Sequence, residues 1–481
     1  MISTYPMVSG KYLINGEWKE TKEVADVINP ANTSEAVGQV AICSKEIVDE
    51  AITAAEKAYE TWSRSDVEDR AARMNAAAEE LAKIIEENVT LFVRENGKTL
   101  VEAKKDLLRC VDVMKGAAAE LLDWWKPQAI PGSQKVQVRR RARGVTAVIT
   151  PWNSPMILTF KRVIPAVLTG NTVVVKPATN CPLTIMTCLK VVADHFPPGV
   201  INIVTGSGKM IGDTLCSDSR VRTVAFVGST ETGKDIMKKS AGNLQKVYME
   251  LGGNDPAIIL EDAYLDDAAI KRLKMGILRA AGQVCSAIKR VYVHESRYGE
   301  VVTKLTKEFE RVVVGDGIQP DVTMGPLNNK AQFDYVSGLI ERTAKSGANV
   351  MTAGIQLNPE TWNQGYYMLP SIVTGVDQQS EVVRVEQFGP VIPILPFSDV
   401  DEAVKLANDS EFGLRASVWT ENEELALELA DRLEAGAVFH NNHTVFSDLA
   451  LDFPGLKESG VSRETRHCGL EFFADSYGFA D

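Results

Sequence analysis

Residues 145–177 read VTAVITPWNSPMILTFKRVIPAVLTGNTVVVKP, with short apolar runs at Val145–Ile149 and Thr172–Val175 and a helical stretch between them. The same alternation continues with apolar runs at Ile201–Val204 and Val224–Val227. Short apolar runs that alternate with helices are typical of βαβ units, whose strands form a parallel sheet with helices on its faces. We therefore expect an α/β fold built on a parallel sheet.

A second series of apolar runs follows, with helices such as Glu421–Leu433 between them. The expected strands are Ala257–Leu260, Arg290–His294, Val391–Leu395, Ala416–Trp419 and Ala437–His440. Two α/β domains that meet near Glu250 are therefore expected. Upstream, Lys45–Trp125 has helical periodicity and Asn15-Gly16 predicts a hairpin. The Arg-rich segment Gln134–Arg143 alternates in the manner of an exposed hairpin.

The composition excludes several classes of protein. With 481 residues, 45% of them hydrophobic, the chain is too long for one ordinary core and predicts two or three domains. Its net charge of -12 offers no basic surface to nucleic acid. No window approaches the roughly 18 apolar residues of a membrane span, and Met1–Gly16 is too polar for a signal peptide. We expect a cytoplasmic protein with no nucleic-acid or membrane partner.

Neither disulfides nor a metal site is expected. The seven cysteines are scattered and include no Cys-x-x-Cys pair. His440 and His443 form the single close histidine pair, and they lack the glutamate and the spacing of a zincin motif.

Cys285, in Gly282-Gln283-Val284-Cys285-Ser286, is the candidate nucleophile. A cysteine that attacks carbon must be a reachable thiolate, and the acyl-enzyme that it forms is then hydrolysed with help from a base. Glu250, in Glu250-Leu251-Gly252-Gly253, can supply that base. A single cysteine is more often a small buried hydrophobe, so this pair needs support from other motifs.

Two glycine-rich segments come close to nucleotide-binding motifs without matching them. Gly206–Gly212 has three residues before its last glycine, where the dinucleotide fingerprint has two. In Gly228–Asp235, Asp235 stands where a P-loop needs Ser or Thr, and its carboxylate would repel phosphate. Both segments follow strands and open helices, so their NH groups either bind a phosphate of some kind or only form tight turns.

Two strand ends carry polar side chains. Trp152 and Asn153 follow the run Val145–Ile149, between prolines that fix the backbone. A neutral amide held there can donate to a developing oxyanion, although an ordinary turn asparagine is the alternative. Lys176 ends the next strand at the same edge, where ligands gather in open parallel sheets, unless it is simply solvated.

Taken together, these elements resemble the aldehyde dehydrogenase superfamily along nearly the whole chain. The matching motifs, in family order, are Ile14-Asn15-Gly16-Glu17-Trp18, Asn29-Pro30-Ala31, Thr150-Pro151-Trp152-Asn153-Ser154-Pro155, Val175-Lys176-Pro177-Ala178, Phe226-Val227-Gly228-Ser229-Thr230, Glu250-Leu251-Gly252-Gly253, Gly282-Gln283-Val284-Cys285, Glu386-Gln387-Phe388-Gly389-Pro390 and Lys457-Glu458-Ser459-Gly460. The resemblance implies an α/β fold with two parallel-sheet domains and a small β oligomerisation arm. It assigns residues 1–125 and 144–250 to dinucleotide binding, 251–440 to catalysis, and 126–143 with 462–481 to the arm.

The resemblance also implies the chemistry. In that family the cysteine attacks an aldehyde to give a thiohemiacetal, which passes hydride to nicotinamide and becomes a thioester. Cys285 takes that role, and Asn153 with the NH of Cys285 holds the oxyanion. Glu250 activates water for deacylation, which is the hydrolytic, non-acylating reaction. Lys161 matches a position linked to proton relay.

The implied cofactor is NAD or NADP. Its expected contacts are Trp152 on the cofactor side, Lys176 at the adenosine ribose, Gly228 and Ser229 near the pyrophosphate, Glu386 at the nicotinamide ribose and Phe388 against the nicotinamide. Family members that prefer NAD usually carry Glu three residues after the lysine, and this chain has Thr179. Glu would repel a 2′-phosphate, whereas Thr can donate a hydrogen bond to it. We therefore expect NADP to be accepted.

The resemblance also implies a substrate channel, whose lining determines which aldehydes are accepted. Its residues are Ser154, Phe160, Val284, Ser286 and Phe453. They form a largely apolar wall without a cationic anchor, so a neutral, apolar or aromatic aldehyde is expected.

The resemblance implies a homo-oligomer, because family members bridge subunits with a terminal strand and a mid-chain hairpin like Gln134–Arg143. Here Tyr477–Asp481 ends the chain soon after the last helical stretch, which favours a homodimer over a homotetramer. Two other functions stay open. One is an acylating enzyme that uses coenzyme A, although a reactive thiol does not need the base Glu250. The other is a non-catalytic binding protein on the same fold.

Overall fold

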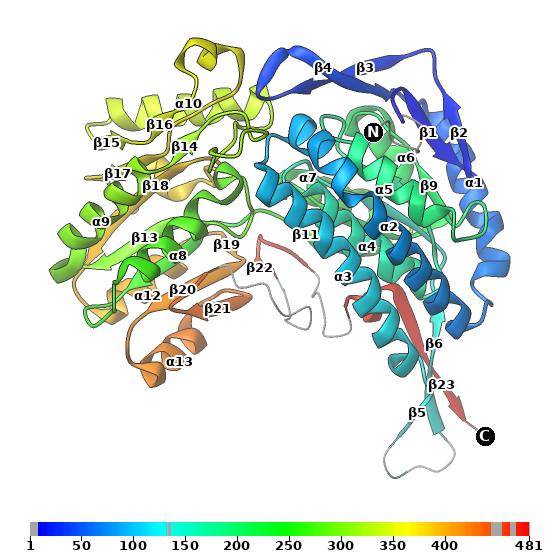
Figure 1. Ribbon diagram of the computed structural model, residues 1–481. Helices are drawn as coiled ribbons and strands as arrows, with labels where there is room; N and C mark the ends of the chain where they lie inside the picture. The colour runs from blue at the N-terminus through cyan, green and yellow to red at the C-terminus, as the bar shows by residue number, and fades with distance from the viewer. Residues whose placement is uncertain (1–7, 131, 133–135, 444–454, 462–467, 481) are drawn as a thin grey trace.

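The computed structural model describes residues 8–130, 132, 136–443, 455–461 and 468–480, and it has two α/β lobes and a projecting arm (Figure 1). Each lobe contains a seven-stranded sheet, mostly parallel. The α/β architecture expected from the alternating sequence is therefore confirmed. Among the described residues, no helix combines the length and the apolar character that crossing a bilayer requires.

The first sheet has five parallel strands and an antiparallel hairpin at one edge. Its strands, in order across the sheet, are β11 (Lys246–Glu250), β10 (Val221–Val227), β7 (Val145–Ile149), β8 (Thr172–Lys176), β9 (Ile201–Ile203), β1 (Lys11–Ile14) and β2 (Glu17–Glu20). β1 and β2 form the predicted hairpin, with Asn15 and Gly16 both at positive φ in the turn. β10 begins three residues earlier than the valine pattern indicated, at Val221.

Helices cover both faces of the first sheet because its strands are apolar on both sides. Val173 and Val175 of β8 belong to one core, and Val174 belongs to the other, as the two-residue period of a strand requires. The first core contains α2 (Val67–Asn96), α3 (Leu100–Trp124), α4 (Pro155–Leu168) and α5 (Leu183–Ala193). The second contains α1 (Lys45–Trp62), α6 (Asp213–Ser217) and α7 (Thr230–Ala241).

The second sheet begins directly after Glu250. Its strands, in order, are β15 (Asn349–Thr352), β17 (Ser371–Thr374), β18 (Val391–Phe397), β13 (Ile288–His294), β12 (Asp255–Ile259), β20 (Arg415–Trp419) and β21 (Ala437–His440). All pairs are parallel except β15 with β17. Its helices are α8 (Asp267–Leu278), α9 (Tyr298–Glu310), α10 (Lys330–Lys345), α11 (Glu381–Arg384), α12 (Val400–Asn408) and α13 (Glu423–Arg432).

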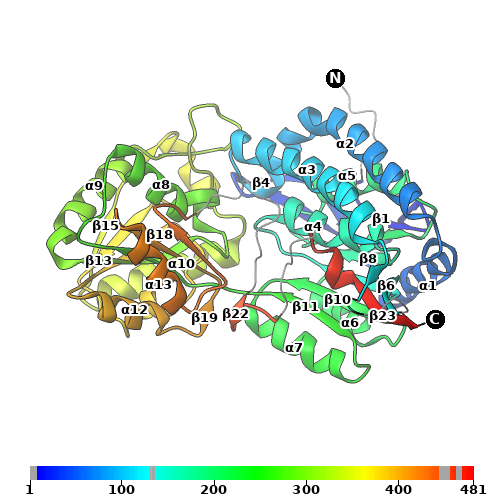
Figure 2. The same cartoon turned by 90° about the horizontal axis from the view of Figure 1, so that it is seen from below.

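Three short two-stranded sheets complete the lobes. They are β3 (Val24–Asn29) with β4 (Asn32–Ala41), β14 (Val313–Val314) with β16 (Ile355–Gln356), and β19 (Phe412–Gly413) with β22 (Leu456–Lys457). The last of these lies between the lobes (Figure 2). A π-helical turn covers Gly208–Gly212, and 3-10 turns cover Glu295–Arg297, Pro359–Gln364, Leu470–Phe473 and Arg279–Gly282, which leads to Cys285.

The arm is a three-stranded sheet of β5 (Gln128–Ala129), β6 (Val136–Ala142) and β23 (Ala474–Ala480). β23 pairs antiparallel with β6 over its whole length, from Ala474 opposite Ala142 to Ala480 opposite Val136. Arg143 anchors the base of the arm, because its guanidinium donates to the carbonyls of Phe472 and Ala474 and pairs with Asp475. The arm projects away from both lobes, with β23 along its edge (Figure 1).

Candidate active site

Cys285 lies just after a tight turn that leads from α8 towards β13. Ala280, Ala281 and Gly282 all have positive φ, of 50°, 57° and 74°. A Cβ at Gly282 would lie 2.3 Å from the carbonyl oxygen of Gly389, so only glycine fits this position. Consecutive left-handed residues store backbone strain, which persists only where the surroundings hold it and is typical of functional sites.

Two side chains hold the turn. Gln283 donates a hydrogen bond of 2.9 Å to the carbonyl of Ala280 and accepts one of 2.9 Å from the backbone NH of Asn328. Glu102, which forms a capping box at the start of α3, accepts a hydrogen bond of 2.8 Å from the NH of Ala280. The strained backbone is therefore fixed from both lobes.

Lys289 also holds the turn through hydrogen bonds to its carbonyl groups. It is buried at the start of β13, and its Nζ donates to the carbonyls of Val284 at 2.9 Å and Cys285 at 2.6 Å. The same Nζ lies 3.6 Å from Oε1 of Glu386. The sequence did not single out Lys289, because a Lys-Arg pair at a strand start usually marks solvent-exposed residues.

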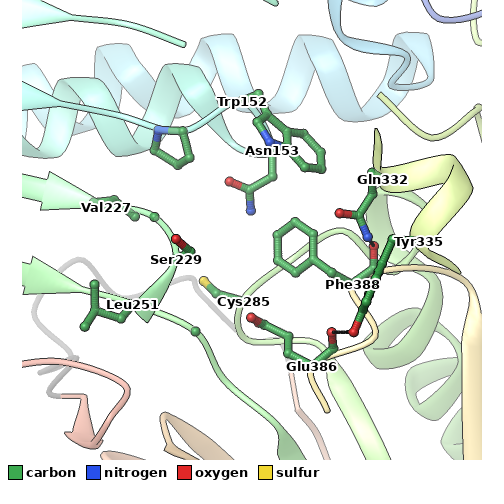
Figure 3. Close-up of a pocket in the computed structure, with 13 residues that line it drawn as sticks. Trp152, Asn153, Val227, Ser229, Leu251, Cys285, Gln332, Tyr335, Glu386 and Phe388 are labelled. Atoms are coloured by element: carbon green, nitrogen blue, oxygen red, sulfur yellow. Dashed lines mark hydrogen bonds between the residues drawn. The ribbon is translucent and has the colours of Figure 1, made fainter. Parts of the chain in front are cut away.

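Asn153 reaches the turn from the first lobe. It follows β7, and its Nδ2 donates a hydrogen bond of 3.0 Å to the carbonyl of Gln283. The side chains of Asn153 and Cys285 face the same pocket (Figure 3). An amide nitrogen carries two hydrogens, so the second can donate to an oxygen bound beside the thiol. That is the requirement for an oxyanion donor.

Glu250 ends β11, and its buried carboxylate forms an ion pair with Arg162 of α4. Arg162 is 1% exposed, and its guanidinium lies over the ring of Tyr248 at 4.8 Å. The resemblance assigned a relay role to the neighbouring Lys161, whereas the cation bound to Glu250 is Arg162. Lys161 and Arg162 are the only charged residues of the otherwise apolar α4, a signal that could have identified both.

Two pockets meet at Cys285. The larger, the Phe388 pocket of about 250 Å³, is also lined by Trp152, Asn153, Ser229, Glu386 and Phe388 (Figure 3). The smaller, the Arg109 pocket of about 60 Å³, is also lined by Glu250, Lys161 and Arg109. Among the described lining residues, Cys285 alone belongs to both pockets. The thiol can therefore contact a molecule in either one.

The thiol of Cys285 is protonated at neutral pH. Burial raises its pKa to about 12, and the negative charge of Glu250 contributes to the increase. Lys289 acts in the opposite direction, because a nearby cation stabilises the thiolate. A thiol with this pKa must lose its proton to a base before it attacks carbon.

The Phe388 pocket combines an aromatic wall with a fixed carboxylate. The rings of Trp152 and Phe388 meet edge to face, with centroids 5.5 Å apart. Oε1 of Glu386 accepts a hydrogen bond of 3.0 Å from the NH of Gly253, and burial raises the pKa of this carboxyl group. A Cβ at Gly252 would lie 2.7 Å from Oε2 of Glu386, so glycine makes room for the carboxylate.

A third pocket, the Lys176 pocket of about 420 Å³, lies further along the edge of the first sheet. Both glycine-rich segments reach it, through Gly208 and Gly212 and through Thr232 and Asp235. Asp235 pairs with Lys239, so part of its charge is neutralised. Burial lowers the pKa of Lys176 to about 8. Thr179, half-buried and three residues beyond β8, is not among the described residues that line this pocket.

The two larger pockets fit the parts of a dinucleotide. Gly228 and Ser229 line the Phe388 pocket, and Thr232, one turn later in α7, lines the Lys176 pocket. The N-terminus of α7 therefore lies where the two pockets approach, and its NH groups and dipole favour an anion there. The aromatic wall and the Glu386 carboxylate of the Phe388 pocket suit one end of a dinucleotide. The buried Lys176 of the other pocket suits the opposite end.

The Arg109 pocket contains some of the residues expected in the substrate channel. Ser154, Val284 and Ser286 line it as expected, whereas Phe160 is fully buried in the first core. Phe160 lies on the far face of α4, because residues 154, 157, 158 and 161 share the face toward the pocket. Phe453 lies outside the described residues.

The Arg109 pocket differs from the apolar wall without a cationic anchor that the sequence led us to expect. The pocket is lined by Arg109, Lys161, Arg279 and Arg415 as well as by Ile157, Leu158 and Val284. Arg109 and Arg279 belong to α3 and to the 3-10 turn after α8, and neither residue lies in one of the matching sequence motifs.

Comparison with known proteins identifies the family of this chain. Residues 18–476 match the aldehyde dehydrogenase family. The chain is 35% identical over 470 residues to alpha-ketoglutaric semialdehyde dehydrogenase of Bacillus subtilis, covering 96% of this chain and 95% of the relative. It is also 35% identical over 481 residues to human aldehyde dehydrogenase 1A1, covering 97% and 93%.

Solved structures agree as well. The betaine aldehyde dehydrogenase of Staphylococcus aureus in complex with NAD+ superposes with a TM-score of 0.92 at 31% identity, covering 98% of this chain and 94% of that one. The structure of a point mutant of an aldehyde dehydrogenase of Bacillus cereus gives a TM-score of 0.91 at 34% identity, covering 98% of this chain and 96% of that one. The chain therefore belongs to the aldehyde dehydrogenase family.

Proposed function

We propose that this NAD(P)-dependent aldehyde dehydrogenase forms a covalent thioester on Cys285 and releases the carboxylic acid by hydrolysis. The observation that carries the proposal is the position of Cys285, which alone among the described residues lines both the Phe388 and the Arg109 pockets. The lobe of residues 1–125 and 144–250 binds the dinucleotide, and residues 251–440 supply the nucleophile. An aldehyde in the Arg109 pocket then meets the thiol from the side opposite the cofactor.

The first half-reaction forms a carbon–sulfur bond. The thiol of Cys285 gives up its proton to a base, and the sulfur attacks the aldehyde carbon to form a thiohemiacetal. The free hydrogen of the Asn153 amide and the NH of Cys285 stabilise the oxyanion, each donor contributing about 3 to 4 kcal/mol. The nicotinamide of NAD(P) supplies the acceptor for the hydride that leaves this carbon. The product on the enzyme is a thioester.

The second half-reaction breaks the same bond. Glu250 takes a proton from water, the hydroxide attacks the thioester carbon, and the sulfur leaves as a thiolate that regains a proton. General-base catalysis of this kind contributes about 10²- to 10⁴-fold. Arg162 holds the Glu250 carboxylate by an ion pair, and we assign it the positioning role for the base. Lys161 lines the Arg109 pocket with Glu250, and we assign it to the path by which the proton leaves the active site.

Replacement of Glu250 by Gln tests the hydrolytic step. The variant retains Cys285 and Asn153, so one equivalent of reduced cofactor should form in a rapid burst. Steady turnover should then fall by about 10²- to 10⁴-fold, the contribution of the base. Stopped-flow absorbance of the reduced cofactor measures both phases. Full-rate turnover by Glu250→Gln would overturn the assigned base, and acceleration of the wild type by coenzyme A would favour the acylating alternative.

The cofactor proposal includes NADP beside NAD. The similar Staphylococcus aureus enzyme binds NAD+, which supports dinucleotide binding here. The Lys176 pocket presents the buried Lys176 and the exposed Lys209, two cations that favour an additional phosphate. Thr179 lacks the carboxylate that would repel it.

The variant Thr179→Glu tests that proposal, because the resemblance to the family places residue 179 near the adenosine ribose and the variant would add a negative charge there. The ratio of kcat/KM for NADP to that for NAD should fall by about tenfold or more, as one unfavourable charge contact predicts. Steady-state kinetics at saturating aldehyde measures the ratio. A wild-type enzyme with far lower efficiency for NADP than for NAD would contradict the proposal.

We also propose that the arm makes a homo-oligomer, with the dimer as the basic unit. β23 is an edge strand of the arm sheet, and its outer edge can pair with a second copy. Phe479 on this strand is 48% exposed, so its ring can make apolar contacts with a second copy.

A further inference from the structure

The Arg109 pocket gathers positive charge from four separate elements. Arg109 comes from α3, Lys161 from α4, Arg279 from the 3-10 turn that follows α8 and Arg415 from β20. Glu250 is the single carboxylate among the described residues that line this pocket, and Arg162 pairs with it. The whole chain carries a net charge of -12, so the charge of this pocket is opposite in sign to that of the protein as a whole.

The cations are held where water screens them poorly. Arg109 and Arg279 are half-buried, and Arg415 is 2% exposed. Burial lowers the pKa of Arg109, and repulsion from Arg279 lowers it further. Like charges near one another in a partly buried pocket are destabilising, and an anion bound between them relieves that repulsion. A carboxylate suits arginine in particular, because the guanidinium donates two parallel hydrogen bonds to it.

Apolar side chains share the pocket with these cations. Ile157 and Leu158 are on the same face of α4 as Lys161, and Val284 precedes the nucleophile. A ligand that reaches Cys285 with its aldehyde therefore finds apolar contacts for its carbon chain and cations for a charged group elsewhere on it. An uncharged aldehyde would use only the apolar contacts.

We propose that the preferred substrate is an aldehyde that also carries a carboxylate, and that Arg109 and Arg279 recognise the carboxylate. The inference rests on the proposed function, because it places the substrate in the pocket that shares Cys285 with the cofactor side. It replaces the neutral substrate expected from the sequence.

Two matched pairs of aldehydes test the inference. Succinic semialdehyde is compared with butanal, and 4-carboxybenzaldehyde with benzaldehyde, so that each pair differs mainly by the carboxylate. With the full-length enzyme and saturating cofactor, kcat/KM for the charged member of at least one pair should be about 10- to 1000-fold higher, mainly through a lower KM. Added NaCl should reduce this preference, because salt screens the attraction.

Arginine variants assign the recognition. Arg109→Gln and Arg279→Gln should each lower the ratio of kcat/KM for the preferred carboxylate aldehyde to that for its neutral partner by about tenfold, as loss of one charge-assisted hydrogen bond predicts. Lys105→Gln is the matched control, because Lys105 is an exposed cation on the same helix, outside the pocket lining. The control should leave the ratio unchanged. Circular dichroism and the thermal midpoint show whether each variant folds.

The outcomes separate this inference from the proposed function. Oxidation of the neutral aldehydes as efficiently as of their charged partners in both pairs would overturn the substrate inference and leave the proposed function intact. If no aldehyde is oxidised with either cofactor, both fall. A charge preference that survives Arg109→Gln and Arg279→Gln without change would overturn the assigned recognition.

Discussion

At the scale of single residues, the electrostatics of Cys285 are set by two neighbours of opposite sign. Burial and Glu250 raise the pKa of the thiol, and Lys289 lowers it. With a pKa of about 12, the thiolate fraction rises tenfold with each pH unit and reaches no plateau near the ordinary thiol pKa. The free enzyme therefore holds its nucleophile in the unreactive, protonated form.

Alkylation by iodoacetamide tests this balance in the absence of substrate. The rate at Cys285 should increase by about tenfold per unit between pH 7 and pH 10, because only the thiolate reacts. At fixed pH, Glu250→Gln should accelerate alkylation, and Lys289→Met should slow it, since the two charges shift the pKa in opposite directions. Mass spectrometry of the peptide that contains Cys285 measures the rates. A plateau below pH 9, or the same shift in both variants, would contradict the assignment.

The buried pair of Arg162 and Glu250 makes a second prediction at this scale. Arg162→Met leaves a buried carboxylate without its cation, which typically costs about 3 to 5 kcal/mol. The double variant Arg162→Met, Glu250→Gln removes both charges and should unfold at a higher temperature than Arg162→Met alone. Differential scanning calorimetry of the wild type, both single variants and the double variant completes the cycle. Additive changes in the unfolding temperature would show that the two residues do not interact.

At the scale of elements, the turn before Cys285 requires glycine for two separate reasons. Gly282 has a positive φ, and a Cβ there would also collide with the carbonyl of Gly389. Gly347 has a positive φ of 94° as well, but a Cβ there would meet nothing within 4 Å. Comparing substitutions at the two glycines therefore distinguishes the free-energy cost of a left-handed backbone from the cost of a steric clash.

Substitution by alanine at both positions tests this difference. Gly347→Ala should lower stability by about 1 to 2 kcal/mol, the usual cost of a left-handed L-residue, without affecting catalysis. Gly282→Ala should lower the thermal midpoint further and reduce kcat strongly, because the displaced turn moves the nucleophile away from the Asn153 amide. Calorimetry and steady-state kinetics on both variants provide the comparison. Equal effects of the two substitutions would show that the backbone at Gly389 can move to make room for the added Cβ.

The element α4 shows how far the sequence could predict the site. The sequence correctly placed Asn153 after the strand Val145–Ile149 and a helical stretch before the next strand, and the structure has α4 there. Adjacent helical residues point about 100° apart, so a one-residue difference decides between Phe160 in the core, Lys161 in the pocket and Arg162 on Glu250. The resemblance to the family identified the motif, but it did not predict the direction in which each of its side chains points.

At the scale of the whole molecule, the sequence predicted the parallel sheets because their strands are short, apolar and separated by helices. It could not predict the Arg109 pocket, because Arg109, Arg279 and Arg415 lie far apart in the chain and follow no common motif. Only the packing of α3 and α4 against the turn after α8 brings these charges to one place. The positive charge of this pocket is thus a property of the assembled lobes.

The arm leads to the last prediction, at the level of assembly. Among the described strands, only β6 pairs with β23, and Phe479 is half-exposed on β23, opposite Gln137 of β6. A charged side chain on an edge strand opposes pairing with a second chain, and it also removes apolar contact area. Phe479→Lys should therefore dissociate the oligomer into monomers, with little effect on the fold of either lobe, because the exposed ring contributes little to a core.

Size-exclusion chromatography with light scattering measures the change in mass. Leu427→Lys is the matched control, because Leu427 is 68% exposed on α13, an element of the second lobe away from the arm (Figure 1). The control makes the same kind of substitution and should retain the mass of the wild type. A Phe479→Lys protein that keeps the wild-type mass would exclude β23 as the principal contact between subunits. A monomeric wild type would remove the assembly role of the arm altogether.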